Sequence, residues 1–557
     1  MDDRYDLASV KLPRVSGTGL GLMVRVLEGP LKGPLMGSLL KNAGITAFRS
    51  LEVDEPPSCR PALGGEGDGA VPAPGFVLCD AAPEVPGERP RTVRDLAAAY
   101  RAGDADPVAV AERALEAIEA SEEGDRPLRA FIAVDREDVL RQARESAQRL
   151  GRGEPLGPLD GVPVAVKDEV DMVPHPTTVG TSFLGSAPAA RDATVVARLR
   201  AAGAVLLGKT NMHEIGISPL GFNAHHGQAR NPHDPGRDTG GSSSGSAAAV
   251  AAGICPVAVG ADGGGSIRIP AAFCGCVGLK ATFGRVSEAG AAPLCWSVAH
   301  LGPITATVED AALAYALVAG PDPGDPGTLG QPPVRLPDLG RRDLSGVTVG
   351  IYRPWFEHAR PAVVEACRAG VGLLEAAGAE VREVMIPGLD AMRVAHAVTI
   401  LSEMAAAMAR WDPEHRRDFG LPGRLLLALA RELTATDYVQ AQRLRTRAVE
   451  DLLRVLAEVD VIATPAAAIT APPVPKDLVR GESDTSTVVE IMRFAFPGNF
   501  AGLPALVVPA GYDPGGLPVG LQLMGRPWEE HLLLELGRVV EAGTARRRPR
   551  VDFDLLG

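Results

Sequence analysis

Apolar residues recur at the three- and four-residue spacing of amphipathic helices from residue 92 onward, and polar residues mark where those helices begin. Thr92 followed by Asp95 has the pattern of a capping box, and Asp106 before Pro107 is a second helix start. A third helix is expected over residues 136–150, where a glycine follows the last apolar position. The pattern therefore predicts that this region begins with a set of helices.

Strand patterns then alternate with helical ones. In residues 161–167 every second position is valine, so the three valines share one face of a strand and Lys167 lies on the other. The further predicted elements are a helix at 192–202, a strand at 204–207, a strand at 347–352, a helix at 361–378 and a strand at 459–464. This alternation is typical of an α/β fold with a largely parallel or mixed sheet.

Residues 1–90 differ from the rest of the chain. Residues 20–40 are rich in leucine, and the breakers Gly29-Pro30 and Gly33-Pro34 divide them into two short helices with broad apolar faces. These helices either pack on the main body or form an exposed amphipathic cap that touches a membrane or gathers a lipid-like ligand. The segment from residue 54 to 90, rich in Pro, Gly and acidic residues, has the composition of a linker.

The composition excludes several classes of protein. With 46% hydrophobic and 22% charged residues, the 557-residue chain is neither disordered nor fibrous. Its net charge of −13 argues against nonspecific binding of nucleic acid. The seven cysteines contain no C-x-x-C pair, which indicates a reduced, metal-free protein. Since we find neither a signal peptide nor a membrane span in the sequence, we expect a cytoplasmic location.

Three segments have unusual local sequences. Lys167 ends a predicted strand and precedes acidic residues, an arrangement that most often indicates a surface ion pair. Residues 239–246 are a Gly/Ser run that leads into an alanine-rich helix, typical of a capped helix start or an anion site. Residues 263–265 are three successive glycines before Ser266, which suggests that the backbone closely approaches another group.

Familiar motifs do not explain these segments. The spacing Gly241-x-Ser243-x-Gly245 matches a nucleophile elbow, but that motif follows a strand, and we interpret residues 230–237 as loop. No glycine run ends in Gly-Lys-Ser/Thr, so a P-loop is excluded. The histidines lack the spacing of zinc ligands, because Ile217 stands where the second histidine of a zinc helix would be.

A serine nucleophile with a lysine base remains. A buried lysine at a strand end can accept a serine proton when its surroundings disfavour its charged form, and Lys167 fits that description. If the lysine does not reach the nucleophile, a second hydroxyl relays the proton, and Ser242 after Gly241 could be held in the unusual backbone that such a relay needs. The glycines at 263–265 would then present N–H groups to the oxyanion beside Ser266.

The segments at 240–253 and 260–270 resemble the signature of the amidase signature family, serine amidohydrolases with a Ser–cis-Ser–Lys triad. The C-terminal segments 502–509 and 516–527 are also similar to that family. The resemblance implies the family's fold: a large twisted mixed β-sheet covered by α-helices on both faces. It divides the chain into an N-terminal helical extension and linker, 1–90, and a catalytic domain, 91–557.

The resemblance also implies roles for individual residues. Ser266 would be the nucleophile, Ser242 the cis-serine relay and Lys167 the base. The remaining site residues that we infer are the oxyanion hole of Gly263, Gly264, Gly265 and the Ser266 N–H; the supporting Ser243, Asp262 and Arg268; and the substrate-pocket candidates Met212 and Ile215. For Asp262 and Arg268, a purely structural ion pair or helix cap is an equal alternative. The family needs no metal or other cofactor.

A finer likeness is to the plant-type fatty acid amide hydrolase branch of that family. It rests on residues 173–177, 208–214, 230–235 and 492–494, and on the extension at 11–61. That branch hydrolyses N-acylethanolamines and related acyl amides, so the implied substrate is a small acyl amide, with no nucleic acid partner. In the branch, the extension lies near the substrate access route and the dimer contact, which implies a homodimer and favours membrane contact through residues 17–45.

Two other interpretations stay open. One is an amidase of small, aryl or carbamate substrates, in which activity would not rise with acyl length. The other, from a different class, is the glutamine-hydrolysing component of a tRNA-dependent amidotransferase. The extension at 1–90 and the acidic composition argue against this second interpretation, and copurifying partner subunits would favour it.

Overall fold

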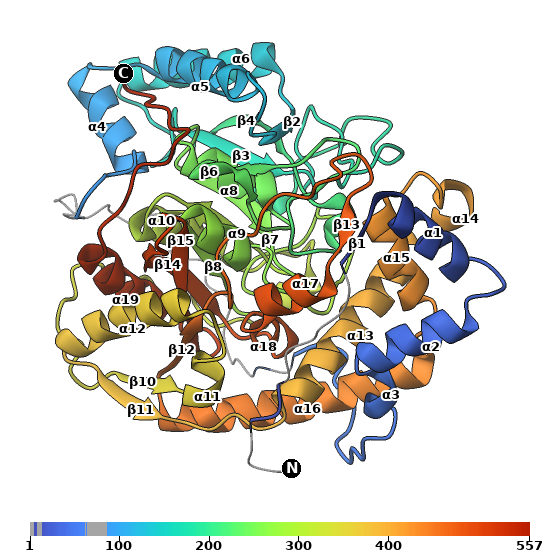
Figure 1. The fold of residues 1–557 in the computed structure, drawn as a ribbon. Coiled ribbons are helices and arrows are strands. Elements are labelled where there is room, and N and C mark those ends of the chain that lie inside the picture. Colours follow the sequence, from blue (N-terminus) through green and yellow to red (C-terminus); the bar gives the residue numbers. More distant parts are fainter. Residues whose placement is uncertain (1–4, 8–13, 62, 64–85) are drawn as a thin grey trace.

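A mixed β-sheet forms the centre of the molecule, with helices around it (Figure 1). The computed structural model describes residues 5–7, 14–61, 63 and 86–557. Among these residues, the sheet contains β2 (Phe131–Ala133), β3 (Pro163–Lys167), β4 (Val205–Thr210), β7 (Val257–Ala261), β8 (Val277–Lys280), β9 (Leu301–Thr305), β10 (Thr348–Ile351), β11 (Glu380–Glu383), β12 (Val461–Pro465), β14 (Ala505–Tyr512) and β15 (Pro518–Gly525). The strand order is β11-β10-β12-β15-β14-β8-β9-β7-β3-β4-β2. The predicted α/β class is confirmed.

Helices cover both faces of the sheet. As a result, every residue of the strands β3, β7, β9 and β15 is buried. In chain order the main-body helices are α4 (Val93–Ala102), α5 (Pro107–Ser121), α6 (Arg136–Gly151), α7 (Thr194–Ala201), α8 (Ser244–Ala251), α9 (Arg268–Cys274), α10 (Val308–Val318), α11 (Arg353–Phe356), α12 (Pro361–Ala376), α13 (Leu389–Met408), α14 (Asp412–His415), α15 (Leu421–Ala430), α16 (Ala435–Glu458), α17 (Thr485–Met492), α18 (Phe496–Phe500) and α19 (Glu530–Gly543). Short 3₁₀ turns lie at Glu214–Gly216 and Pro326–Thr328.

The predicted helix starts are confirmed at the level of individual hydrogen bonds. Thr92 and Asp95 form the expected capping box of α4, and the Asp106 carboxylate accepts from the first backbone N–H groups of α5. The interpretation of residues 230–237 as loop was wrong. They contain the hairpin of β5 (Arg230–Asn231) and β6 (Asp234–Asp238), which lies outside the main sheet. The apolar pattern did not indicate it, because neither strand contributes a face to the core.

The three strands β4, β3 and β7 run parallel and place the unusual segments at one edge of the sheet. β3 pairs with β4 on one side and β7 on the other. Lys167 therefore ends β3 beside the end of β7, where the chain continues into the glycine run before Ser266. The carboxyl ends of neighbouring parallel strands are a frequent place for functional sites in α/β sheets.

The N-terminal extension folds as α1 (Gly17–Leu27), α2 (Gly33–Asn42) and α3 (Ile45–Phe48), so the two predicted helices are followed by a third short one. In Figure 1 they lie beside α13, α15 and α16. α1 buries Leu20, Val24 and Leu27 with residues of α15, and β1 (Val15–Ser16) pairs with β13 (Glu482–Ser483). Most of the predicted linker, residues 64–85, lies outside the described residues.

The extension also keeps apolar side chains at the surface. Leu22 of α1 is 61% exposed, and Leu31, in the turn between α1 and α2, is 79% exposed, so the extension packs on the main body while leaving some apolar side chains uncovered. Within the described residues, we find no helix whose length and hydropathy would allow it to cross a membrane.

Candidate active site

Lys167 is fully buried at the end of β3, and its Nζ atom faces three oxygen atoms. Its Nζ lies 2.9 Å from Ser242 Oγ, 3.3 Å from the Ala261 carbonyl oxygen and 2.8 Å from Glu169 Oε2. The strand ends here because the next residues turn away, with the Val170 N–H donating to the Lys167 carbonyl. The structure thus brings Lys167 and Ser242 together, as the sequence interpretation requires.

Ser242 lies at the start of the segment that leads into α8. The peptide bond between Gly241 and Ser242 is cis. A side chain at Gly241 would place its Cβ 2.2 Å from the Leu220 carbonyl oxygen, so only glycine fits at this position. The Ser242 carbonyl accepts a hydrogen bond from the His213 N–H at 3.1 Å, which fixes the segment against the next loop.

Ser266 follows the glycine run between β7 and α9 and is 9% exposed. Its carbonyl oxygen accepts from the Ser243 N–H at 3.3 Å, so the two serine segments are joined through their backbones. Within the described chain, the Ser266 hydroxyl has no hydrogen-bond partner, and the contact between Ser242 Oγ and Ser266 Oγ is therefore not formed here. The Ser266 hydroxyl is consequently free to meet a ligand.

The backbone N–H groups around Ser266 differ in whether they are already used. The Gly265 N–H donates to Asp262 Oδ1 at 2.6 Å, so the prediction that it serves an oxyanion hole is not supported in this structure. For the N–H groups of Gly263, Gly264 and Ser266, the described part of the chain provides no acceptor. These three groups are therefore the available donors. The sequence could not separate them, because the three glycines differ only in their tertiary contacts.

Asp262 and Arg268 form a fully buried ion pair, with Arg268 Nε 3.0 Å from Asp262 Oδ2. Burial alone would raise the pKa of Asp262, but the Arg268 guanidinium, together with Lys280 and Asn499, brings it well below its ordinary value. The same carboxylate accepts from the N–H groups of Gly265 and Ile267. Asp262 therefore holds the loop that carries Ser266. Ser243 has a similar supporting role, since its hydroxyl is hydrogen-bonded to the backbone of Ala261, directly before this loop.

Replacing Asp262 by alanine is expected to destabilise the fold by about 3–5 kcal/mol, because Arg268 would keep a buried charge without its partner. Folding lowers the pKa of Asp262, so the stabilisation from its carboxylate is present at pH values above the ordinary Asp pKa. It is lost progressively as the pH falls below that pKa toward the lower pKa of the folded state. Thermal unfolding at several pH values measures both effects. Glu380→Ala, which removes an exposed partner of Arg382, is the control and should leave the midpoint near that of the wild type; equal midpoints for the two variants would contradict the prediction.

A largely apolar cavity of about 240 Å³ opens beside Ser266 and Gly264. It continues away from Ser266 to the N-terminal extension, so residues far apart in sequence form one wall. The apolar lining includes Ile400, Leu401 and Met404 of α13, Leu425 and Leu426 of α15, Val489 and Met492 of α17, and Leu7 and Ala43 of the extension.

The two pocket candidates from the sequence do not line this cavity. Met212 and Ile215 are fully buried in a neighbouring apolar cluster, and the adjacent Gly216 and Ile217 reach the cavity instead. Ile215 has a positive φ of 47°, unusual for a β-branched residue, and this turn directs the chain toward the cavity one residue later. Periodicity could not indicate the helices that form the cavity, because their apolar residues match those of ordinary core helices.

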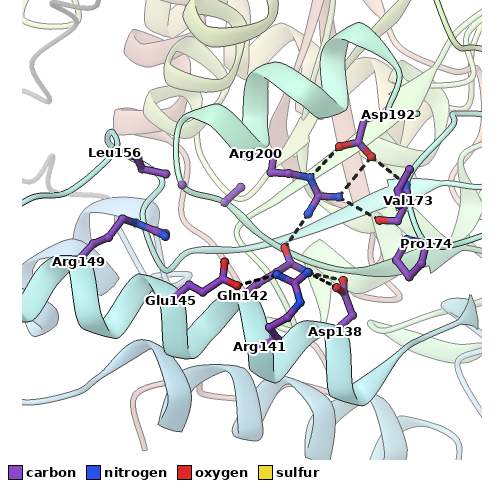
Figure 2. A pocket seen from close by; sticks show the side chains of 12 residues that line it. Asp138, Arg141, Gln142, Glu145, Arg149, Leu156, Val173, Pro174, Asp192 and Arg200 are labelled. Atoms are coloured by element: carbon purple, nitrogen blue, oxygen red, sulfur yellow. Dashed lines mark hydrogen bonds and ion pairs between the residues drawn. The ribbon is translucent and has the colours of Figure 1, made fainter. Parts of the chain in front are cut away.

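A second hollow, of about 460 Å³, lies between α6, α7 and the start of β4 (Figure 2). Its charged side chains all have partners. Arg141 pairs with Asp138 and Glu145, Arg200 pairs with Asp192, and Arg149 pairs with Asp160, which lies outside the lining. Because these charges are already matched, we assign this hollow no ligand. Nor do the described residues contain a cluster of His, Cys, Asp and Glu suited to holding a metal ion.

Comparison with known proteins gives the class of protein that this fold and site define. The family model Amidase matches residues 110–534, so the chain belongs to the amidase family, a class of hydrolases that act on amide bonds. Its structure is similar to the native peptide amidase from Stenotrophomonas maltophilia, with a TM-score of 0.70, 32% identity, and coverage of 82% of this chain and 98% of that chain.

Two relatives indicate where in the family the chain lies. It is 38% identical to a fatty acid amide hydrolase of Medicago truncatula over 590 residues, which cover 100% of this chain and 97% of the relative. It is also 37% identical to a glutamyl-tRNA(Gln) amidotransferase component of Chloroflexus aurantiacus over 494 residues, which cover 82% of this chain and 98% of the relative. The fatty acid amide hydrolase thus aligns with the extension as well as with the main body.

Proposed function

We propose that this protein hydrolyses N-acyl amides with a long apolar acyl chain, such as N-acylethanolamines, through an acyl-enzyme on Ser266. The observation that carries the proposal is the apolar cavity, which leads from Ser266 to Leu7 and Ala43 of the extension. A cavity of this lining accommodates a hydrocarbon chain beside the nucleophile. The full-length similarity to a fatty acid amide hydrolase supports the same substrate class.

In the proposed first step, the unprotonated amine of Lys167 takes the Ser242 hydroxyl proton while Ser242 takes the Ser266 hydroxyl proton. The Ser266 oxygen then attacks the amide carbonyl. The 2.9 Å contact between Lys167 and Ser242 supports the first transfer. The second requires a rotation of the Ser266 side chain, whose hydroxyl is without a partner among the described residues.

The negative charge that develops on the carbonyl oxygen needs donors beside Ser266. We assign this role to the N–H groups of Gly263, Gly264 and Ser266, whose oxyanion-binding contribution is typically about 2.7–4 kcal/mol per donor. His396 of α13 is hydrogen-bonded to the Gly263 carbonyl at 2.9 Å, which holds this part of the loop. Burial lowers the pKa of His396 to about 4, so its imidazole is neutral at physiological pH.

Ser242 then gives its proton to the leaving amine and recovers one from Lys167 across the same contact, and the C–N bond breaks to give an acyl ester of Ser266. Protonation of the amine matters because an amide anion is a poor leaving group. Water attacks the ester, and its proton passes through Ser242 to Lys167. When the bond between the acyl carbon and the Ser266 oxygen breaks and the carboxylic acid leaves, that proton returns through Ser242 to the Ser266 oxygen, which restores the free enzyme. No atom of Asp262 or Arg268 takes part in these steps; they hold the loop.

The proposal predicts that kcat/KM rises with acyl length, since burying each additional methylene stabilises binding by about 0.8 kcal/mol. Ala397→Trp, which fills the cavity from α13, should lower kcat/KM for a long-chain N-acylethanolamine by about tenfold or more while leaving the acetyl amide within about threefold. Hydrolysis rates across a series of acyl lengths measure this. Ala406→Trp, at an exposed position of the same helix, is the matched control.

For an amidase of small or aryl substrates, kcat/KM would not rise with acyl length. Ala397→Trp would then change kcat/KM by the same factor for short and long acyl amides. The amidotransferase alternative is favoured by the similarity to the Chloroflexus aurantiacus protein, but that relative covers 82% of this chain whereas the fatty acid amide hydrolase covers all of it. Glutamine hydrolysis that depends on added partner subunits would support this alternative.

A further inference from the structure

We propose that Glu169 is a positioning residue that sets the pH range in which Lys167 acts as a base. Glu169 Oε2 lies 2.8 Å from Lys167 Nζ, and both side chains are buried, with 7% and 1% of their surfaces exposed. Glu169 lies in the turn that follows β3, and its carboxylate returns to Lys167, while the Asp168 carboxylate contacts Thr178 and Lys209. The inference rests on the proposed base role of Lys167.

The surroundings of Lys167 match its protonated form. An ammonium group has three donors and no acceptor, and Lys167 faces three acceptors, namely Ser242 Oγ, the Ala261 carbonyl and Glu169. Of these three, Glu169 is the one that carries charge. A carboxylate at this distance favours the ammonium form, which has no free electron pair to accept the Ser242 proton.

The other titratable groups near this pair do not replace Glu169. Burial lowers the pKa of His213 to about 4, so it is neutral, and burial raises the pKa of the Cys295 thiol well above its ordinary value. Burial also raises the pKa of Glu288, with Asp325 and Glu169 adding to the effect. Glu403 of α13 bonds Ser297 and Tyr438 rather than Lys167.

Removing this charge has a defined consequence for the pH profile. Without the carboxylate, the ammonium form loses its charged partner, so Lys167 releases its proton at a lower pH. The acid-side midpoint of kcat/KM should therefore move down, while the plateau falls modestly because the lysine becomes a weaker base. A residue with a merely structural role would lower activity without moving the midpoint.

The test compares pH profiles of kcat/KM for the wild type and Glu169→Gln, which keeps the shape of the side chain. We expect the acid-side midpoint of Glu169→Gln to lie at least about one pH unit below that of the wild type. At a given pH on the acid limb, the variant should then keep a fraction of its own plateau kcat/KM about ten times larger than the wild type keeps of its plateau. Glu169→Asp keeps the negative charge on a shorter side chain, so its acid-side midpoint should lie between those of the wild type and Glu169→Gln. Thermal unfolding and fluorophosphonate labelling of Ser266 verify that each variant is folded.

Glu403→Gln is the matched control, because it neutralises another buried carboxylate that does not touch Lys167. A midpoint that is unchanged or raised in Glu169→Gln, an equal shift in Glu403→Gln, or a wild-type profile without an acid limb would overturn the inference. Lys167→Ala separates this outcome from failure of the proposed function: if it keeps wild-type activity, Lys167 is not the base, whereas an inactive Lys167→Ala with an unmoved Glu169→Gln midpoint removes only the role of Glu169.

Discussion

Replacing Ser266 by alanine should reduce kcat/KM for every amide substrate by more than about 10³-fold, to the level left by binding and the oxyanion donors alone. The reason is that the mechanism we propose forms the acyl-enzyme ester on the Ser266 hydroxyl, which lies beside the cavity and is without a partner in the described chain. The same substitution should abolish covalent labelling by a fluorophosphonate. Steady-state hydrolysis and intact-protein mass spectrometry measure the two effects.

Ser244→Ala is a suitable control for that experiment. Ser244 belongs to the same Gly/Ser segment as Ser242, and its hydroxyl donates to the Asn211 carbonyl rather than to Lys167. It should keep activity within a few fold of the wild type and be labelled normally. Labelling of Ser266→Ala at the full rate would mean that another residue is the nucleophile.

Lys167→Ala is expected to lose about 10²–10⁴-fold in kcat/KM at neutral pH, the usual contribution of a positioned general base. Part of the activity should return at high pH, where hydroxide can take the Ser242 proton. Lys167→Arg distinguishes a base from a mere positive charge, since a guanidinium keeps the charge beside Glu169 but does not lose its proton in proteins. Rates measured from neutral to alkaline pH provide the comparison.

We expect both variants to be inactive at neutral pH and only the alanine variant to recover. Wild-type activity in Lys167→Arg would show that the side chain acts through its charge. A normal rate in Lys167→Ala would place the base elsewhere.

Local patterns predicted the parts of the fold that depend on local chemistry. The capping residues Thr92 and Asp106 fix helix starts through bonds to nearby N–H groups, so they could be identified without tertiary information. The strand that ends at Lys167 was likewise indicated by its alternation. The unusual glycine-rich segments indicated that Ser242 and Lys167 belong to one site, and the two side chains are in contact in the structure. These features combine short-range geometry with an unusual composition.

The features that sequence reasoning missed depend on tertiary contacts. Whether the Gly265 N–H is free depends on where the Asp262 carboxylate points, and whether Ile215 or Ile217 lines the cavity depends on one backbone turn. Glu169 resembled an ordinary acidic residue after a strand until its distance to Lys167 was known. The cavity itself joins α13, α15 and α17 with the extension, which no local pattern connects.

The extension contributes Leu7, Asn42 and Ala43 to the cavity wall, and ion pairs such as Arg49–Asp437 attach it to the main body. An acyl chain that contacts both sides of the cavity binds the attached arrangement in preference to any detached one. By mass action, such a ligand must strengthen the attachment of the extension, and the extension must strengthen ligand binding by the same factor. A ligand that fills the cavity should therefore also protect the first helices from proteases, because ligand binding and attachment of the extension strengthen each other.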